Sequence, residues 1–170
     1  MALGFACLFG LFAWFFIAGE AMSDPGGLRG AGLVALWTVP WAALAVFAWF
    51  RPERATVVLA FLTAAVVVLA VWFALDPGGW RSFENGHGPV RAIGVFVLML
   101  PLALLAWRRP RIAGWMLLIV GLVPVLAASV AGGAGRAGLS STLAVGAPAA
   151  IDGILYLLSL VSISPRRLAR

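Results

Sequence analysis

The sequence predicts an all-α, polytopic integral membrane protein, and three observations support this fold class. Of its 170 residues 64% are hydrophobic and only 11% are charged, whereas a soluble domain carries about 25% charged residues. The apolar residues collect in runs of roughly the 20 residues that a membrane-spanning helix needs. Short segments rich in Pro, Gly and Arg separate these runs. We therefore predict a bundle of six transmembrane helices that forms a single domain over residues 1–170.

Six apolar runs are the predicted spans. Because a helix rises about 1.5 Å per residue, roughly 20 residues cross the hydrocarbon layer, and only the fourth run is clearly short. The runs end at charged turns with proline, such as Arg51-Pro52 after the second run and Asp76-Pro77 after the third. The predicted spans cover residues 2–19, 31–50, 55–75, 92–107, 112–131 and 143–164.

The charges of the connecting segments differ between the two sides of the predicted bundle. Eight arginines and one glutamate fall on one side, a net charge of +7, whereas four arginines and four acidic residues cancel on the other. Cytoplasmic loops are enriched in Arg and Lys, so we predict that both termini are cytoplasmic. The Ala-, Gly- and Val-rich, lysine-free composition favours a bacterial cytoplasmic (inner) membrane. The inner set is Arg51, Glu53, Arg54, Arg108, Arg109, Arg111, Arg166, Arg167 and Arg170; the outer set is Glu20, Asp24, Arg29, Asp76, Arg81, Glu84, Arg91 and Arg136.

Pairs of connecting segments resemble each other. Residues 49–54 read WFRPER and residues 107–111 read WRRPR, and Asp-Pro-Gly-Gly occurs at both 24–27 and 76–79. One interpretation is a set of three parallel helical-hairpin repeats, since transporters are often built from internal repeats. The other is that Gly, Pro and Arg are the ordinary residues of short membrane turns. The sequence leaves both interpretations open.

The longest predicted connection, residues 76–91, carries its own pattern. Asp76 precedes a proline and can cap a short helix. We predict a helix over residues 77–85 that lies on the membrane surface. Trp80 and Phe83 are three residues apart, so both rings share one face of this helix and would insert into the membrane interface.

Counting residue types excludes several chemistries. The chain has no lysine, which rules out a Schiff-base enzyme and a phosphate-binding Walker A loop. A single Cys7 and a single His87 cannot form a disulfide or a Cys/His zinc site within one chain. No catalytic signature motif is present, so we predict a protein that is not an enzyme and binds no cofactor or metal. Nucleic acid is not an expected partner, because the arginines lie in short clusters between apolar runs.

Asp152 is the acidic residue that falls inside a predicted span. It lies midway along the sixth run, where a charge costs about 2.5–3.5 kcal/mol, so it must face other helices or a hydrated cavity, or be protonated. Tyr156 and Ser159 follow on the same helical face, and Gly146 and Gly153 allow a neighbouring helix to approach closely. We predict a binding site of Asp152, Tyr156 and Ser159. When empty, the Asp152 carboxyl should be neutral and donate a hydrogen bond to Tyr156 or to a backbone carbonyl.

Two functions of different class fit this sequence about equally well. The first is a small channel or transporter component for an ion or small solute, with Asp152 in its core. The second is a non-catalytic accessory or structural subunit of a larger membrane complex, in which Asp152 holds a helix interface. A lipid-modifying membrane enzyme ranks third, because its motifs are missing. The expected partners are the lipid bilayer and either another membrane protein or a second copy of the chain.

Overall fold

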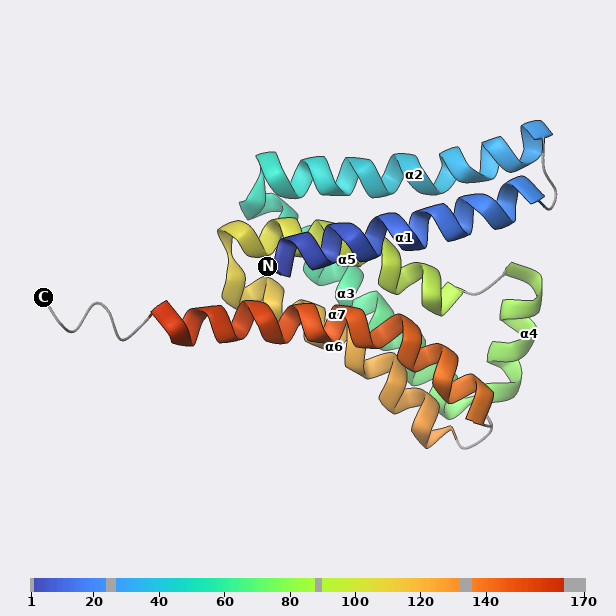
Figure 1. Ribbon diagram of the computed structural model, residues 1–170. Helices are drawn as coiled ribbons and strands as arrows, with labels where there is room; N and C mark the ends of the chain where they lie inside the picture. Colours follow the sequence, from blue (N-terminus) through green and yellow to red (C-terminus); the bar gives the residue numbers. More distant parts are fainter. Residues whose placement is uncertain (1, 24–26, 88–89, 132–135, 164–170) are drawn as a thin grey trace, which may run out of the picture.

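The computed structural model is all-helical (Figure 1). It describes residues 2–23, 27–87, 90–131 and 136–163, and the side chains of these residues except 84–93, 136–141 and 161–163. Within these ranges the chain forms seven helices. They are α1 (Ala2–Ser23), α2 (Gly27–Phe50), α3 (Pro52–Leu75), α4 (Pro77–His87), α5 (Val90–Arg108), α6 (Pro110–Val130) and α7 (Arg136–Ile163).

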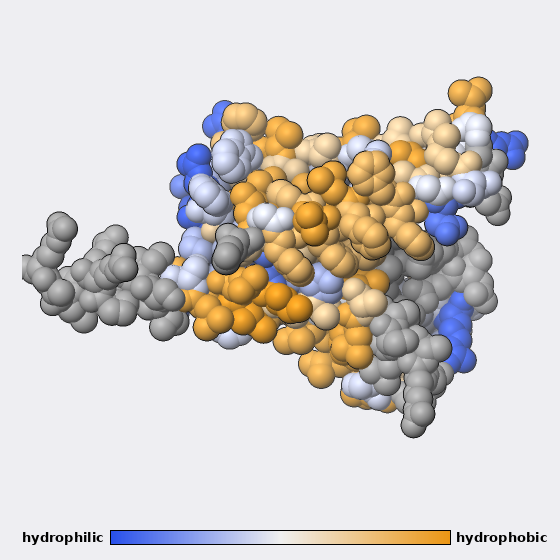
Figure 2. Space-filling view, in the orientation of Figure 1, coloured by the Kyte–Doolittle hydropathy of each residue, from blue (hydrophilic) through white to orange (hydrophobic). Residues whose placement is uncertain are grey.

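The long helices have the length and composition of membrane-crossing helices. Five segments in the described part of the chain qualify, namely α1, α2, α3, α6 and residues Thr142–Leu160 of α7, and Gly94–Arg108 of α5 is a shorter apolar helix. On the face shown in Figure 2, hydrophobic side chains form a band between hydrophilic patches at the two ends. The protein therefore has the architecture of a helical membrane protein.

The predicted apolar runs fall on α1, α2, α3, α5, α6 and α7 as far as the described residues extend. Each of these helices is longer than its predicted run because turn residues join it: α2 begins at Gly27 and α3 begins at Pro52. Proline is well suited to the first helical position, where its missing N–H has no helical partner to lose. Some residues used in the charge argument lie outside the described residues or have undescribed side chains. These are Asp24, Glu84, Arg91, Arg136, Arg166, Arg167 and Arg170.

Three connections consist of one non-helical residue followed by a proline. Arg51, Asp76 and Arg109 have nearly the same conformation, with φ of −131°, −135° and −135° and ψ of 59°, 76° and 65°. Proline disfavours the helical conformation in the residue before it, so one helix ends there and the next begins at once. Helical hydrogen bonding continues on both sides: the Arg51 N–H donates to Phe47 O, and Arg51 O accepts from the Ala55 N–H, each at 2.9 Å.

The single-residue turns place the arginine-rich segments together. In Figure 1 the α2–α3 and α5–α6 turns lie at the left end of the bundle, and α4 runs across the right end. The Nη2 atom of Arg109 lies 3.4 Å from Oε1 of Glu53. This ion pair connects the α5–α6 turn to the α2–α3 turn. The positive charge of both turns therefore collects at one end of the molecule.

The predicted short helix after Asp76 is present, but its aromatic side chains do not lie as predicted. Asp76 Oδ1 accepts a 2.9 Å hydrogen bond from the backbone N–H of Gly79, the expected cap. Trp80, however, is completely buried, and its ring packs edge-on against Trp72 of α3 with centroids 5.2 Å apart. Phe83 is half-buried, and its ring centroid lies 5.4 Å from that of Trp72. The prediction that both rings insert into the membrane is wrong, because the tight turn folds α4 onto the aromatic end of α3.

The most extensive helix contact in the fold is between α6 and α7. An added Cβ on Gly121 would lie 2.5 Å from Gly146 O and 2.6 Å from Ala150 N. Two helical turns further along α7, an added Cβ on Gly153 would lie 2.8 Å from Gly114 O. The two backbones therefore touch directly, as small residues permit in membrane helices. The predicted close approach along Gly146 and Gly153 is confirmed.

Candidate functional site

Asp152 lies in the interior of the bundle. Its side chain is 0% exposed, and among the described residues neither carboxyl oxygen has a hydrogen-bond partner. The prediction that it donates to Tyr156 or to a backbone carbonyl is therefore wrong within this part of the chain. A buried polar group without a partner costs roughly 1–3 kcal/mol, and more when it is charged. Asp152 is thus a costly residue whose oxygens are uncommitted.

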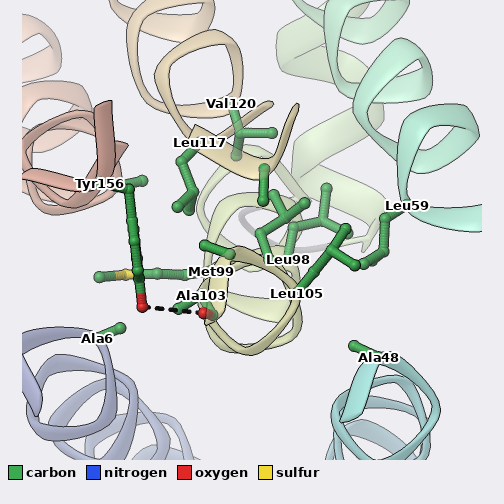
Figure 3. Packing of buried hydrophobic residues seen from close by; sticks show 14 of the residues in the cluster. Ala6, Ala48, Leu59, Leu98, Met99, Ala103, Leu105, Leu117, Val120 and Tyr156 are labelled. Carbon is green, nitrogen blue, oxygen red and sulfur yellow. Dashed lines mark hydrogen bonds between the residues drawn. The ribbon is translucent and has the colours of Figure 1, made fainter. Parts of the chain in front are cut away.

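Tyr156, one helical turn after Asp152, bonds to a different helix. Its hydroxyl donates a 2.9 Å hydrogen bond to the backbone carbonyl of Ala103 on α5. Figure 3 shows the Tyr156 side chain crossing from α7 towards α5, with Met99 beside it and Ala6 of α1 near the hydroxyl end. This bond uses the hydroxyl proton of Tyr156 and links α7 to α5. The hydroxyl therefore donates no hydrogen bond to the carboxyl of Asp152.

Ser159 does not join the other two residues. It is exposed, and its hydroxyl donates a 2.6 Å hydrogen bond to the carbonyl of Tyr156 on its own helix. Serine in a helix commonly satisfies itself on a preceding carbonyl in this way. The structure brings Asp152 and Tyr156 together in the core and leaves Ser159 at the surface.

The position of Asp152 follows from the spacing of small residues on α7. Gly146 and Gly153 turn one face of α7 to α6. Ala149 and Tyr156 lie at spacings of three and four residues from Asp152, on the same helical face, and both belong to the main core cluster. That cluster also includes Ala6 of α1, Met99 and Ala103 of α5, and Leu117 and Val120 of α6 (Figure 3). The carboxyl of Asp152 is therefore set into an apolar region where several helices meet.

The chemistry available at Asp152 is that of a single isolated carboxyl. Among the described residues, no three His, Cys, Asp or Glu side chains form a group that could hold a metal ion. The described residues also give Asp152 no ion pair. A carboxyl of this kind can accept or release one proton, or contribute one ligand to a transient cation. It can equally act as a hydrogen-bonding group towards another molecule that reaches it.

Two further polar features were not foreseen from the sequence. A cavity of about 40 Å³ lies between α1, α2 and α5, and at its wall the indole N–H of Trp14 donates a 2.7 Å hydrogen bond to Thr38 Oγ1. The residues lining this cavity do not include Asp152. Thr63 of α3 is also buried, and its hydroxyl has no partner among the described residues. In the sequence, Thr38 and Thr63 could have been singled out because each is a polar residue within an apolar run.

Comparison with protein-family models, curated proteins and solved structures finds no match to this chain. The fold and the site define a class, a helical membrane protein in whose described part Asp152 is an isolated buried carboxyl. Its function has to be argued from that chemistry.

Proposed function

We propose that this protein is a small multi-pass channel or transporter component that moves a proton, another small cation or a small solute. Asp152 is the group that the transported species meets. One observation carries the proposal: Asp152 is fully buried, and neither carboxyl oxygen has a hydrogen-bond partner among the described residues. Ionisable residues within membrane helices commonly belong to ion pathways and proton relays.

Because the oxygens of Asp152 have no partner among the described residues, transient binding of a ligand is favoured over a permanent role in helix packing. A carboxyl that serves only to hold two helices together would be expected to bond the neighbouring helix, as Tyr156 does with Ala103. Asp152 has no such bond in the described structure. The carboxyl could therefore release and regain its proton, or exchange it for another cation, without breaking a hydrogen bond to a described residue. In the empty site we expect the carboxyl to carry its proton, because an unpaired charge is costly in an apolar interior.

The proposal includes six crossings of a bacterial inner membrane with both termini in the cytoplasm. The sixth crossing is α5, of which Gly94–Arg108 is apolar. Support for the orientation comes from the arginine-rich turns at Arg51 and Arg109, which the Arg109–Glu53 contact joins at one end of the bundle. The hairpins of the proposed repeat are α1–α2, α3–α5 and α6–α7, and an Arg-Pro step, at Arg51 and at Arg109, links each hairpin to the next.

A second candidate is the non-catalytic subunit of a membrane complex or of a homo-oligomer. The observation that favours it is the exposure of the α1–α2 hairpin. Only 11% of the most apolar window of α2 is buried within the chain. Large side chains such as Phe12 and Phe15 are each 65% exposed. In this alternative a partner helix covers the hairpin and Asp152 has a structural role.

The test is flux through liposomes that contain the purified protein, measured with a pH-sensitive dye and with cation-sensitive dyes. Asp152→Asn keeps the shape of the side chain and removes ionisation, so proton- or cation-dependent flux should fall to the level of empty liposomes. Glu20→Gln is the matched control, because Glu20 is an exposed carboxylate, and its flux should equal that of the wild type. Difference infrared spectra should show a protonated carboxyl signal that disappears in Asp152→Asn.

Two outcomes would overturn the proposal. Undiminished flux in folded Asp152→Asn would remove Asp152 from the pathway. A folded wild-type protein that conducts none of the tested species would favour the subunit alternative. In that case Asp152→Asn should be nearly silent, whereas Asp152→Leu should weaken helix packing by about 1–2 kcal/mol.

A further inference from the structure

The end of the bundle that carries the α2–α3 and α5–α6 turns presents arginine beside tryptophan. Five arginines and one glutamate lie in these two turns, a net charge of +4. Three tryptophans lie within four residues of them along the chain. We call this the Arg-Trp surface, and it consists of Arg51, Arg54, Arg108, Arg109, Arg111, Trp49, Trp107 and Trp115.

Two contacts between the turns hold the surface together, one across 56 and the other across 59 residues of sequence. Arg109 donates from Nη2 to Glu53 Oε1 at 3.4 Å. The guanidinium carbon of Arg108 lies 5.8 Å from the centroid of the Trp49 ring, within the range of a cation–π contact. Exposed ion pairs contribute little stability, so their effect here is to position the two turns next to each other. The positive charges of both turns then act on the same ligand.

Three arginines of the surface are uncommitted. Arg51, Arg54 and Arg111 are exposed, and none of them has an ion pair or hydrogen bond to another described side chain. A guanidinium presents a planar set of donors that matches the oxygens of a phosphate group in bidentate geometry. The unpaired guanidinium donors of these three arginines are therefore suited to bind a phosphate-bearing anion.

The tryptophans narrow the choice of anion. Trp107 and Trp115 are 61% and 56% exposed, and Phe50 beside the α2–α3 turn is 71% exposed. Tryptophan at the end of a membrane-crossing helix prefers the headgroup level of the bilayer. The adjoining surface of the long helices is apolar (Figure 2). A ligand that fits both parts has an anionic headgroup and hydrocarbon chains.

We propose that the Arg-Trp surface binds the phosphodiester headgroup of anionic phospholipids, with the acyl chains against the apolar helices next to it. Charge complementarity supports this occupant, because a surface with net charge +4 attracts lipids of negative charge over zwitterionic ones. A free phosphate would satisfy the arginines and leave the exposed tryptophans without a role. The site is independent of Asp152 and of any transport activity.

The experiment measures lipid binding to the purified protein in neutral detergent micelles, by native mass spectrometry during titration with phosphatidylglycerol or phosphatidylcholine. Wild type should bind phosphatidylglycerol in preference to phosphatidylcholine. The double variant Arg51→Gln/Arg54→Gln should bind it about 30-fold more weakly, as expected for two basic residues near an anionic lipid. The matched control Arg29→Gln/Arg81→Gln removes two exposed arginines from elsewhere in the chain and should keep the wild-type affinity.

Equal binding of both lipids by the wild type would overturn the proposal without reference to any variant. So would a folded Arg51→Gln/Arg54→Gln protein that keeps the full preference, or an equal loss in the control variant. Inorganic phosphate is added in a parallel titration. If millimolar phosphate displaces phosphatidylglycerol completely, the surface recognises a soluble anion and the lipid assignment is wrong.

Discussion

The α1–α2 hairpin and the α6–α7 pair have similar hydropathy and very different packing. In the most apolar windows of α1 and α2, 17% and 11% of residues are buried, against 44% and 39% in α6 and α7. The first pair has a backbone contact at one end, between Gly30 and Ala21, and further along it meets through aromatic side chains and one hydrogen bond, from Trp14 to Thr38. The second pair meets backbone to backbone at Gly121 and Gly146. Residue size at the interface, rather than total hydrophobicity, distinguishes the two.

The physical reason lies in the solvent. Lipid chains are as apolar as leucine, so two membrane helices gain little by hiding apolar surface from lipid. Close packing and interhelical hydrogen bonds must supply the attraction. Glycines on both helices let α6 and α7 make many dispersion contacts. In α1–α2, away from the contact of Gly30 with Ala21, larger side chains separate the two backbones and leave the cavity of about 40 Å³ against α5.

The largest expected difference between the two pairs comes from removing a leucine. Leu117 of α6 is 0% exposed, and Leu117→Ala should lower the free energy of unfolding by about 2–5 kcal/mol. Leu36→Ala on α2 is the control, because Leu36 is 64% exposed and its loss should cost within about 0.5 kcal/mol. Unfolding by SDS in mixed micelles, followed by circular dichroism, measures both. Equal losses would mean that α2 is as tightly packed as α6.

A smaller difference is expected from adding a methyl group. Gly121→Ala should cost about 1–3 kcal/mol, because the new Cβ meets the backbone of α7 and the helices must move apart. Gly32→Ala on α2 is the control, since nothing lies within 4 Å of its added Cβ. This control should be neutral or stabilise by up to about 1 kcal/mol, as alanine does in a helix. The same SDS titration applies, and a destabilised Gly32→Ala would show a hidden neighbour for α2.

The smallest effect concerns the hydrogen bond within the α1–α2 hairpin. Thr38→Val removes the acceptor of the Trp14 indole and should cost about 0.6 kcal/mol, the average for such bonds between membrane helices. Thr56→Val is the control, because Thr56 bonds only the carbonyl of Pro52 on its own helix. Near-ultraviolet circular dichroism should change for Thr38→Val through Trp14. An unchanged spectrum and stability would mean that the bond does not order the hairpin.

The long helices were predictable from the sequence because each is a nearly unbroken apolar run. Their ends were less so: hydropathy stops at polar residues, whereas α2 continues down to Gly27 and α3 starts at Pro52. The burial of Trp80 could not be predicted from its neighbours in the sequence. Its three-residue spacing to Phe83 fits a surface helix equally well, and only the packing of α4 on Trp72 and its neighbours decides the matter.

For the candidate site, the sequence indicated where the carboxyl lies along its helix but not what surrounds it. The position of Asp152 in an apolar run predicted a group that avoids lipid, in keeping with its full burial. The partner of Tyr156 is a backbone carbonyl on α5, and no side-chain pattern reports a backbone acceptor. Ser159 shares the helical period of Asp152 and is nonetheless exposed. Periodicity gives a direction around one helix and does not say how far a neighbouring helix extends.

The single-residue connections at Arg51 and Arg109 limit how this molecule can change shape. One residue spans at most about 3.6 Å, so α2 cannot slide lengthwise past α3, nor α5 past α6, without unwinding a helical turn. Rotation about the backbone of the linking residue is the remaining freedom. These two points lie at the same end of the bundle and are bridged by Arg109 and Glu53, whereas the third such connection, at Asp76, joins α3 to α4 at the other end. A relative movement of α2 against α3, or of α5 against α6, would thus be a rocking motion with its pivot at the end that carries Arg51 and Arg109 and its widest displacement at the end crossed by α4.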